Sequence, residues 1–245
     1  MGVRPACYAR GMVRSTDTLA AEPRADGIAA DEAMATGPRP GTYARGTETV
    51  GTILKAAHDV LIEEGASAFT IRRIASACGM KVGNVSYHFP RKELLIKIML
   101  DDLLESYDKL LESEVRRPDI SPEDRLRLIV KLCLDDIAGK RTTRLFTELW
   151  ALANHNAFVA DRVRAFYQRV HDFIGEVLVE LNPALSPDEV QTLALYVSAS
   201  MEGTTPFLGF EKPWAAKMPQ ITTIAAEAMV MLAKSITPAQ IAGKP

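Results

Sequence analysis

Apolar residues recur at helical spacing along almost the whole chain from Thr49 onward. In the first such segment, 49–65, they follow the i, i+3, i+4, i+7, i+11 template of an amphipathic helix, and Gly65 suits the residue just after its end. The apolar face of that helix consists of Val50, Ile53, Leu54, Ala57 and Leu61. No segment of useful length alternates apolar and polar residues as a half-buried strand does. The sequence therefore predicts an all-α protein.

Capping signals mark further helix starts. "SPED" at Ser121 and "SPDE" at Ser186 each place serine at the N-cap, proline at the first helical position and an acid in the first turn. Glu189 completes a capping box in the second. A long helix is expected after Pro90. The helices predicted beyond it are 122–139, 142–153, 156–181, about 187–204 and about 218–236.

Length and composition limit the class of protein. A chain of 245 residues with 47% apolar residues can form one or two globular domains. It has no apolar run near the roughly 18 residues of a membrane helix, and its three scattered cysteines suit reduced thiols, so we expect a soluble, cytoplasmic protein without membrane contact. Residues 1–46 show no period and are predicted to be a disordered leader, or partly a misassigned start. Residues 239–245 are expected to be a tail.

Charge is distributed unevenly. Residues 45–100 contain 8 Lys/Arg against 5 Asp/Glu, a balance of +3, whereas residues 101–245 contain 16 against 21, a balance of −5. The whole chain carries a net charge of only −2, so no general attraction to polyanions is expected. The local excess is a weak indication of a polyanion-binding face in the first segment.

Two short helices follow the first one. Thr70 is a good N-cap for a helix that Gly79 ends, and a third helix over about 82–88 stops before Pro90. This is a helix-turn-helix pattern, whose second helix lies in the major groove of DNA in DNA-binding proteins. Val82 or Val85 would anchor the third helix with Phe89. The side chains left to point outward are Lys81, Asn84, Tyr87 and His88.

Those outward residue types suit DNA. Asparagine can bond the edge of adenine bidentately, while lysine, tyrosine and histidine suit phosphate oxygens or a thymine methyl group. Gly83 would let the backbone approach the duplex closely. Taken singly, Tyr87 and His88 are better explained by packing within the protein. As a spaced set, the outward residues favour contact with DNA.

The segment "TIRRIASACGMKVGNVSYHFPRKELL", Thr70 to Leu95, together with the helix before it, resembles the tetracycline-repressor (TetR) family of transcriptional regulators. Ala75, Gly79, the Tyr-His-Phe run at 87–89, Lys92 and Leu94 all stand at that family's spacing. The close resemblance covers about 50 residues; the remainder is similar only in length and helical layout. It implies a three-helix DNA-binding domain, 47–92, and a helical ligand-binding and dimerisation domain, 93–238.

Carried over by position, the resemblance assigns roles to individual residues. Phosphate contacts would come from Thr70 and Arg72, base contacts from Val82, Gly83, Asn84 and Tyr87, and further backbone contacts from His88 and Lys92. Two residues depart from the family pattern. Lys81 stands where a capping serine is usual, and would exchange that cap for a phosphate contact. Ser86 stands where a tyrosine is usual, so a phosphate contact there would be shorter or lost.

Two helices of the second domain are apolar nearly all round. Residues 191–201 include no charged side chain, and residues 221–232 include only Glu227. Such helices must be covered on two sides. The cover is either the rest of a monomer or a second subunit, and the resemblance favours a homodimer through 187–204 and 218–236. A two-fold dimer would recognise a pseudo-palindromic double-stranded operator with half-sites about 34–36 Å apart.

The middle region is rich in aromatic residues that suit the wall of a pocket for a small organic effector. The candidates are Phe146, Glu148, Trp150, Phe158, Tyr167 and His171. No catalytic constellation, metal-ligand cluster or cofactor motif is visible, and the four histidines are scattered, so an enzyme is not expected. The sequence therefore favours a ligand-responsive DNA-binding regulator, more often a repressor than an activator. A helical adaptor that binds protein instead of DNA is the alternative.

Overall fold

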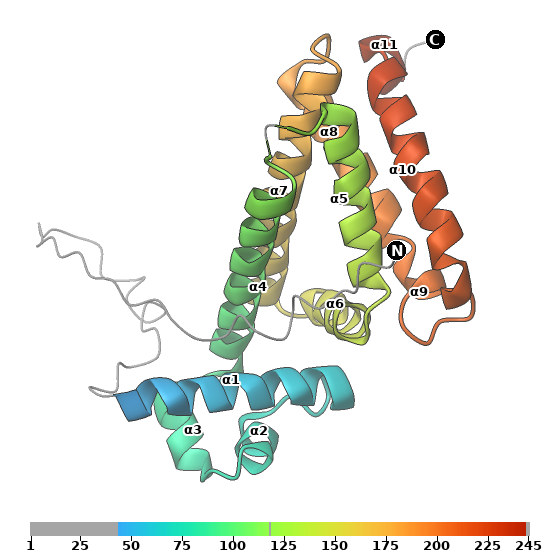
Figure 1. The fold of residues 1–245 in the computed structure, drawn as a ribbon. Helices are drawn as coiled ribbons and strands as arrows, with labels where there is room; N and C mark the ends of the chain where they lie inside the picture. Colours follow the sequence, from blue (N-terminus) through green and yellow to red (C-terminus); the bar gives the residue numbers. More distant parts are fainter. Residues whose placement is uncertain (1–43, 118, 244–245) are drawn as a thin grey trace, which may run out of the picture. The chain divides into compact units, whose positions relative to one another are not determined.

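The protein is helical throughout the part that the computed structural model describes, residues 44–117 and 119–243. Those residues contain no strand, which confirms the all-α prediction. The elements are α1 (Ala44–Glu64), α2 (Ile71–Ala77), α3 (Val82–His88), α4 (Lys92–Glu114), α5 (Pro122–Ile137), α6 (Lys140–Ala153), α7 (Ala157–Leu181), α8 (Pro187–Glu202), α9 (Thr205–Leu208), the 3-10 turn η1 (Ala215–Lys217), α10 (Met218–Ser235) and α11 (Pro238–Ile241) (Figure 1).

Helices α1, α2 and α3 form a small three-helix group. Helix α2 begins because the Thr70 hydroxyl accepts a hydrogen bond from the Arg73 backbone N–H, 3.1 Å away. The Arg73 guanidinium donates two hydrogen bonds to the Glu64 carboxylate at the end of α1. Gly79, at φ +67°, supplies the left-handed turn between α2 and α3, a conformation that glycine adopts without strain. Phe69 and Phe89 are fully buried within the group.

The other helices build a larger bundle around α7. Helix α7 packs against α4, α5, α6 and α8, and α5 also packs against α10. Buried apolar side chains form two clusters. One is shared by α1–α3 with α4, α6 and α7, and the other joins α5, α7, α8 and α10. The capping serines predicted for α5 and α8 are present, including the capping box at α8.

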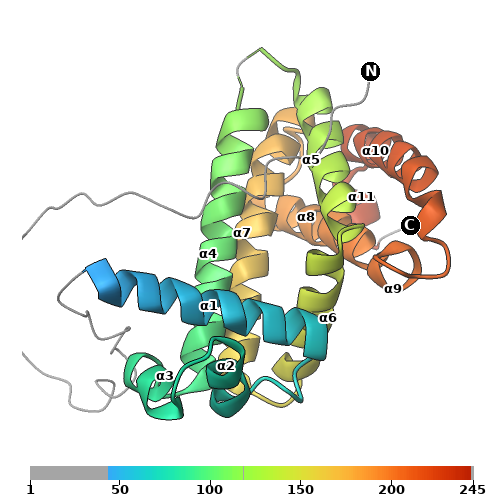
Figure 2. The ribbon, with the colours of Figure 1, turned by 60° about the horizontal axis from the view of Figure 1, so that its bottom comes forward.

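Helix α6 holds the end of α1. Helix α1 contacts both α4 and α6 (Figure 2). The Glu148 carboxylate on α6 accepts a hydrogen bond of 2.7 Å from the backbone N–H of Ala66, just after α1. Lys140 and Arg144, also on α6, pair with Glu63 on α1. The turn after α1 is therefore fixed to the bundle by charge-assisted bonds as well as by apolar packing.

Two boundaries and one connection differ from the predictions. Helix α1 begins at Ala44, inside the predicted leader, because helical structure continues upstream of the apolar pattern. The predicted tail contains α11, which starts with a capping box between Thr237 and Gln240. The stretch between α8 and α10 contains α9 and η1, too short to show a period. Residues 1–43 of the predicted leader, 1–46, lie outside the described residues. Among the described helices, none combines the length and low charge needed to cross a membrane.

Candidate functional site

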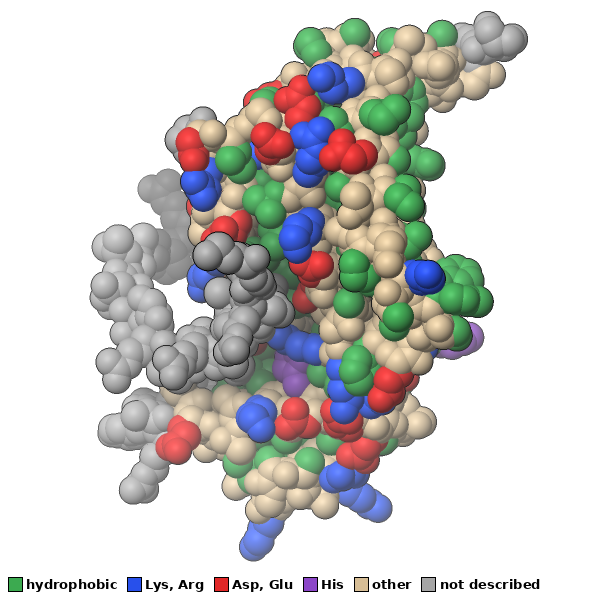
Figure 3. Space-filling model, turned by 45° about the vertical axis from the view of Figure 1, so that its right-hand side comes forward, with side chains coloured by type: hydrophobic (Ala, Val, Ile, Leu, Met, Phe, Trp, Pro, Cys, Tyr) green, Lys and Arg blue, Asp and Glu red, His purple; other side chains and the backbone are tan. Residues whose placement is uncertain are grey.

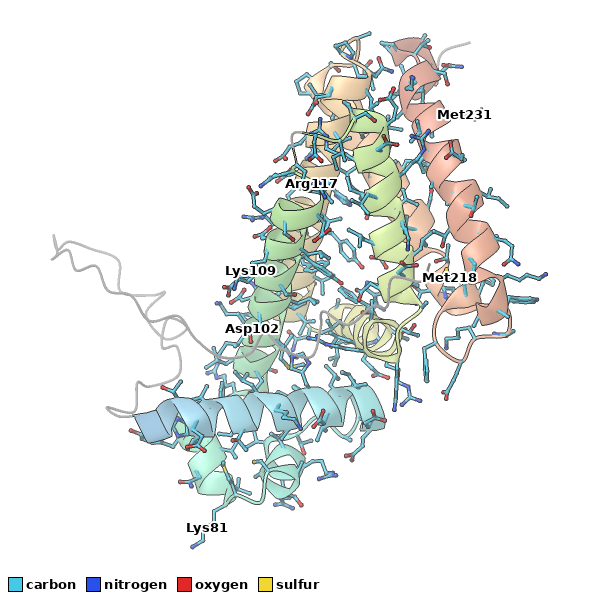
Figure 4. The ribbon with its side chains drawn as sticks, in the orientation of Figure 1. Lys81, Asp102, Lys109, Arg117, Met218 and Met231 are labelled. Atoms are coloured by element: carbon cyan, nitrogen blue, oxygen red, sulfur yellow. The ribbon has the colours of Figure 1, made fainter. Side chains whose placement is uncertain are left out.

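Helix α3 presents one exposed face. Lys81, Val82, Gly83, Asn84 and Tyr87 are all exposed, whereas Val85 is fully buried. Val85 is therefore the anchor, and Val82, 45% exposed, is available to a partner. Lys81 projects away from the helices at the end of the molecule where α3 lies (Figure 4). The backbone at Gly83 is uncovered, since a Cβ built on this residue would have no other atom within 4 Å.

The prediction that the His88 side chain points outward is wrong. It is buried, 9% exposed, because positions 85, 88 and 89 share the inner face of this short helix at i, i+3 and i+4. Its ring packs edge-on against Tyr87, with centroids 5.2 Å apart. Its Nδ1 has no hydrogen-bond partner among the described residues. His88 supports the position of Tyr87 and does not form part of the exposed face.

Residues beside α3 extend its exposed surface. Arg72, on α2, is exposed, and Lys92, at the first position of α4, is half-buried. The Thr70 oxygen is used as the α2 cap, which leaves its hydroxyl proton to be donated elsewhere. Lys81 occupies the N-cap position of α3 without a side-chain capping bond, as predicted from the missing serine. Ser86 is half-buried.

A second group of functional candidates lies within the larger bundle. The Phe146 ring on α6 lies within 6.2 Å of the rings of Trp150, Phe166 and Tyr167, centroid to centroid. Trp150 Nε1 donates a hydrogen bond of 3.0 Å to the Tyr167 hydroxyl. The His171 ring stacks on Tyr167 at 6.3 Å. The structure thus brings together four of the six predicted pocket residues: Phe146, Trp150, Tyr167 and His171.

Two half-buried acids adjoin this aromatic group, and the sequence analysis missed them. Burial raises the pKa of Glu202, at the end of α8, to about 7; the hydrogen bond with Tyr167 opposes that rise, and the charge of Asp136 adds to it. Burial and the Glu202 charge both raise the pKa of Tyr167. Asp136, on α5, accepts a hydrogen bond from the Tyr107 hydroxyl on α4. We call Tyr107, Asp136, Trp150, Tyr167 and Glu202 the buried polar cluster.

Two predicted pocket residues lie elsewhere. Glu148 points to the turn after α1, where its carboxylate binds the Ala66 N–H, because positions 148 and 150 fall on different faces of α6. Phe158 lies beneath the guanidinium of Arg162, 5.6 Å from its ring centroid. Asp136 could not be identified from the sequence, because it directly follows the exposed Asp135 and neighbouring positions fall on different faces of a helix. Glu202 was the one acid of the cluster that the sequence could have indicated, because it directly follows the uncharged residues 191–201.

Helices α8 and α10 each have a buried and an exposed apolar face. Leu195 and Tyr196 on α8 are 52% and 54% exposed, and Ile224 and Met231 on α10 are 63% and 69% exposed. Glu227, the acid in the apolar part of α10, is paired with Arg127 on α5 at 2.8 Å. Its charge is therefore drawn toward α5. The described residues contain no group of three or more His, Cys, Asp or Glu that could hold a metal ion.

A three-helix group with an exposed α3, joined to a helical bundle with a buried polar cluster, defines a helix-turn-helix regulator of transcription. Comparison with known families supports this class. The profile for bacterial regulatory proteins of the tetR family matches residues 53–98, and that for the C-terminal region of BetI-type transcriptional repressors matches residues 122–230. The chain belongs to the TetR family of transcriptional regulators.

Individual relatives are distant. An uncharacterised HTH-type regulator from the dhlA 5′ region of Xanthobacter autotrophicus is 26% identical over 134 residues, 53% of this chain and 65% of that protein. The HTH-type regulator CymR of Pseudomonas putida is 34% identical over 95 residues, 38% of this chain and 44% of CymR. The aligned regions thus span about half to two thirds of these curated relatives.

Solved structures show the same fold. A transcriptional regulator from Rhodococcus sp. Rha1 superposes with a TM-score of 0.60 at 20% identity, covering 76% of this chain and 98% of that one. A regulator from Saccharomonospora viridis, solved with choline, has a TM-score of 0.59 at 17% identity, covering 77% and 97%. FadR from Bacillus subtilis, solved with stearoyl-CoA, has a TM-score of 0.60 at 14% identity, covering 76% and 98%.

Proposed function

We propose that this chain is a cytoplasmic, homodimeric repressor that binds a pseudo-palindromic DNA operator and is released by a small organic effector. The observation that carries the proposal is the exposed face of α3, where Lys81, Asn84 and Tyr87 point away from a helix anchored by Val85. A helix this short gains little from exposing such residues alone. Placed in a major groove, they supply an adenine-edge contact and phosphate contacts.

The dimer in this proposal forms through α8 and α10. Their outer faces expose Leu195, Tyr196, Ile224 and Met231, and large apolar side chains in groups mark interaction surfaces. An isologous interface uses the same surface of both copies, and it sets the two α3 helices in the symmetric arrangement that a pseudo-palindrome requires.

The proposed effector site is the buried polar cluster with its aromatic neighbours. Apolar walls with a few polar groups suit small-molecule recognition, and Trp150, Tyr167 and Glu202 supply the indole, hydroxyl and carboxyl groups. Two regulators of the same fold were solved with choline and with stearoyl-CoA. These molecules differ so much in chemistry that they support an effector site without identifying this chain's effector.

The experiment is a titration of the purified chain against a fluorescent DNA fragment from upstream of its own gene, with an unrelated fragment beside it. Anisotropy is measured at two salt concentrations, because phosphate contacts make log affinity fall linearly with log salt. The proposal requires tight, salt-sensitive and fragment-selective binding. Failure to bind any DNA, even at low salt, would reject it and favour a protein-binding adaptor.

Single substitutions then test the α3 face. Asn84→Ala should cost about 1–3 kcal/mol on the preferred fragment and little on unrelated DNA. Lys81→Ala should weaken binding to every fragment and lower the salt slope by about 1; no capping bond is lost, because the Lys81 side chain makes none. Lys109→Ala is the matched control, since Lys109 is an exposed lysine on α4 that pairs with Glu105 (Figure 4). Equal effects at Lys81 and Lys109 would show that α3 is not the binding helix.

A further inference from the structure

The connection between α8 and α10, residues 204–217, carries two exposed aromatic side chains. We call it the α9 segment. Phe207 is 53% exposed and Trp214 is 56% exposed. Their rings lie together, with centroids 6.1 Å apart. Two large aromatic rings exposed side by side are unusual on a monomer surface, where scattered single residues are the norm.

The α9 segment is fixed by its own backbone hydrogen bonds and by contacts with α6. The backbone N–H of Trp214 donates to the carbonyl of Phe207 at 3.1 Å, which fixes the two aromatic residues relative to each other. The Phe210 N–H donates to the hydroxyl of Thr143 on α6 at 2.8 Å. A Cβ at Gly209 would lie 2.6 Å from that same hydroxyl, so the backbone sits directly on α6. The aromatic pair therefore stands on a preorganised support.

The single acidic residue of the α9 segment is paired with α6. Glu211 pairs with Arg144 on α6 at 3.3 Å. The Arg144 guanidinium also lies over the Phe210 ring, 5.8 Å from its centroid. Preorganised aromatic residues are typical of the residues that dominate interface energies.

The α9 segment connects the end of α8 to the start of α10, and η1 within it contacts both α9 and α10. Hydrophobic side chains gather along the α10 side of the molecule (Figure 3). The exposed residues of the two helices and the segment, Leu195, Tyr196, Phe207, Trp214, Ile224 and Met231, belong to consecutive elements of the chain. This continuity indicates that whatever covers α8 and α10 also covers the segment.

We propose that the α9 segment is part of the subunit interface, with Phe207 and Trp214 packing against the second copy of this chain. The inference rests on the proposed dimer through α8 and α10. Because an isologous interface repeats each contact, both copies contribute their aromatic pair. In each copy, Arg144 pairs both with Glu211 on the α9 segment and with Glu63 on α1. A single side chain therefore links the proposed interface to the helix-turn-helix group.

Sedimentation equilibrium of the full chain gives the first test. Phe207→Ala and Trp214→Ala should each weaken dimerisation at least about tenfold, as truncation of a central interface aromatic does. Tyr87→Ala is the matched control, since Tyr87 is also an aromatic residue, 53% exposed, but lies on α3. It should leave the dimer dissociation constant unchanged.

Fluorescence gives a second, independent test. The chain has two tryptophans, so Trp150→Phe leaves Trp214 as the sole reporter. In the dimer, its emission should be shifted to the blue and protected from acrylamide. Addition of Met231→Asp, which puts a charge on the outer face of α10, should reverse both effects.

The outcomes separate this inference from the proposed dimer. A dimer whose affinity is unaffected by Phe207→Ala and Trp214→Ala, and whose Trp214 is open to acrylamide, would overturn the inference and leave the dimer through α8 and α10 intact. A chain that remains monomeric at every concentration would overturn both.

Discussion

Glu202→Gln should make the protein more stable at neutral and alkaline pH. The substitution keeps the size of the side chain and a hydrogen bond to Tyr167, but it removes the ionisable carboxyl group. Burial holds the pKa of Glu202 at about 7, against an ordinary value of 4.5. A carboxyl group with a raised pKa in the folded state favours folding while it is protonated. That contribution is complete below pH 4.5 and is lost as the pH rises through 7.

The magnitude follows from the same values. The rise in the pKa of Glu202 from 4.5 to about 7 corresponds to a loss of up to about 3 kcal/mol of unfolding free energy at high pH, at roughly 1.4 kcal/mol per pKa unit. Between pH 5 and pH 8, the free energy of unfolding of Glu202→Gln should therefore rise by about 2–3 kcal/mol relative to the parent. His58, whose pKa burial lowers to about 4, titrates in an overlapping range with the opposite sign. It is present in both proteins, so its effect cancels in the difference.

The assay is urea unfolding of parent and variant at one protein concentration across pH 5–8, followed by circular dichroism. Gln191→Ala is the control, because it changes an exposed side chain on α8 that carries no titratable group. Its difference from the parent should stay flat with pH. If Glu202→Gln gives the same flat difference, Glu202 does not titrate near neutrality in the folded protein, and the reasoning about the buried polar cluster is refuted.

Three further substitutions test local structure. Thr70→Ala removes the α2 cap and should cost about 1 kcal/mol of unfolding free energy; an unchanged urea midpoint would contradict the capping role. Asn182→Ala leaves two backbone carbonyls near the end of α10 without their donor and should cost about 2 kcal/mol, whereas Asn182→Asp should not restore both bonds. Gly209→Ala places a Cβ 2.6 Å from the Thr143 hydroxyl and 2.7 Å from the Thr205 carbonyl, so calorimetry should show a loss of about 1–3 kcal/mol, and a stability equal to the parent would show that the α9 segment moves freely.

The sequence predicted the elements whose signals are local. Thr70, Ser121 and Ser186 each mark a helix start that the structure confirms, because a cap depends on residues within one turn. Periodicity likewise located the long helices to within a few residues. Helix α9 was missed because a four-residue helix cannot show a period of 3.6.

The buried polar cluster could not be predicted in the same way. Its members come from five helices and are spread along the sequence from Tyr107 to Glu202. Residue type suggested the aromatic members, since large rings are commonly buried. The acidic members are of residue types common on surfaces, and only the packing of α5 and α8 against α7 makes them half-buried. His88 was misplaced for a related reason, because a seven-residue helix does not reveal which of its faces is covered.

Helix α6 connects the two candidate sites through its own geometry. Trp150 on one face donates to Tyr167 in the buried polar cluster, and Glu148 on another face accepts from Ala66 beside the helix-turn-helix group. A helix transmits rotation and translation along its length because its hydrogen bonds resist local deformation. An effector that shifts the α6 backbone at Trp150 would therefore strain the Glu148–Ala66 bond or move the turn after α1 with it. Since coupling free energy is reciprocal, DNA that holds that turn in place must oppose the same displacement.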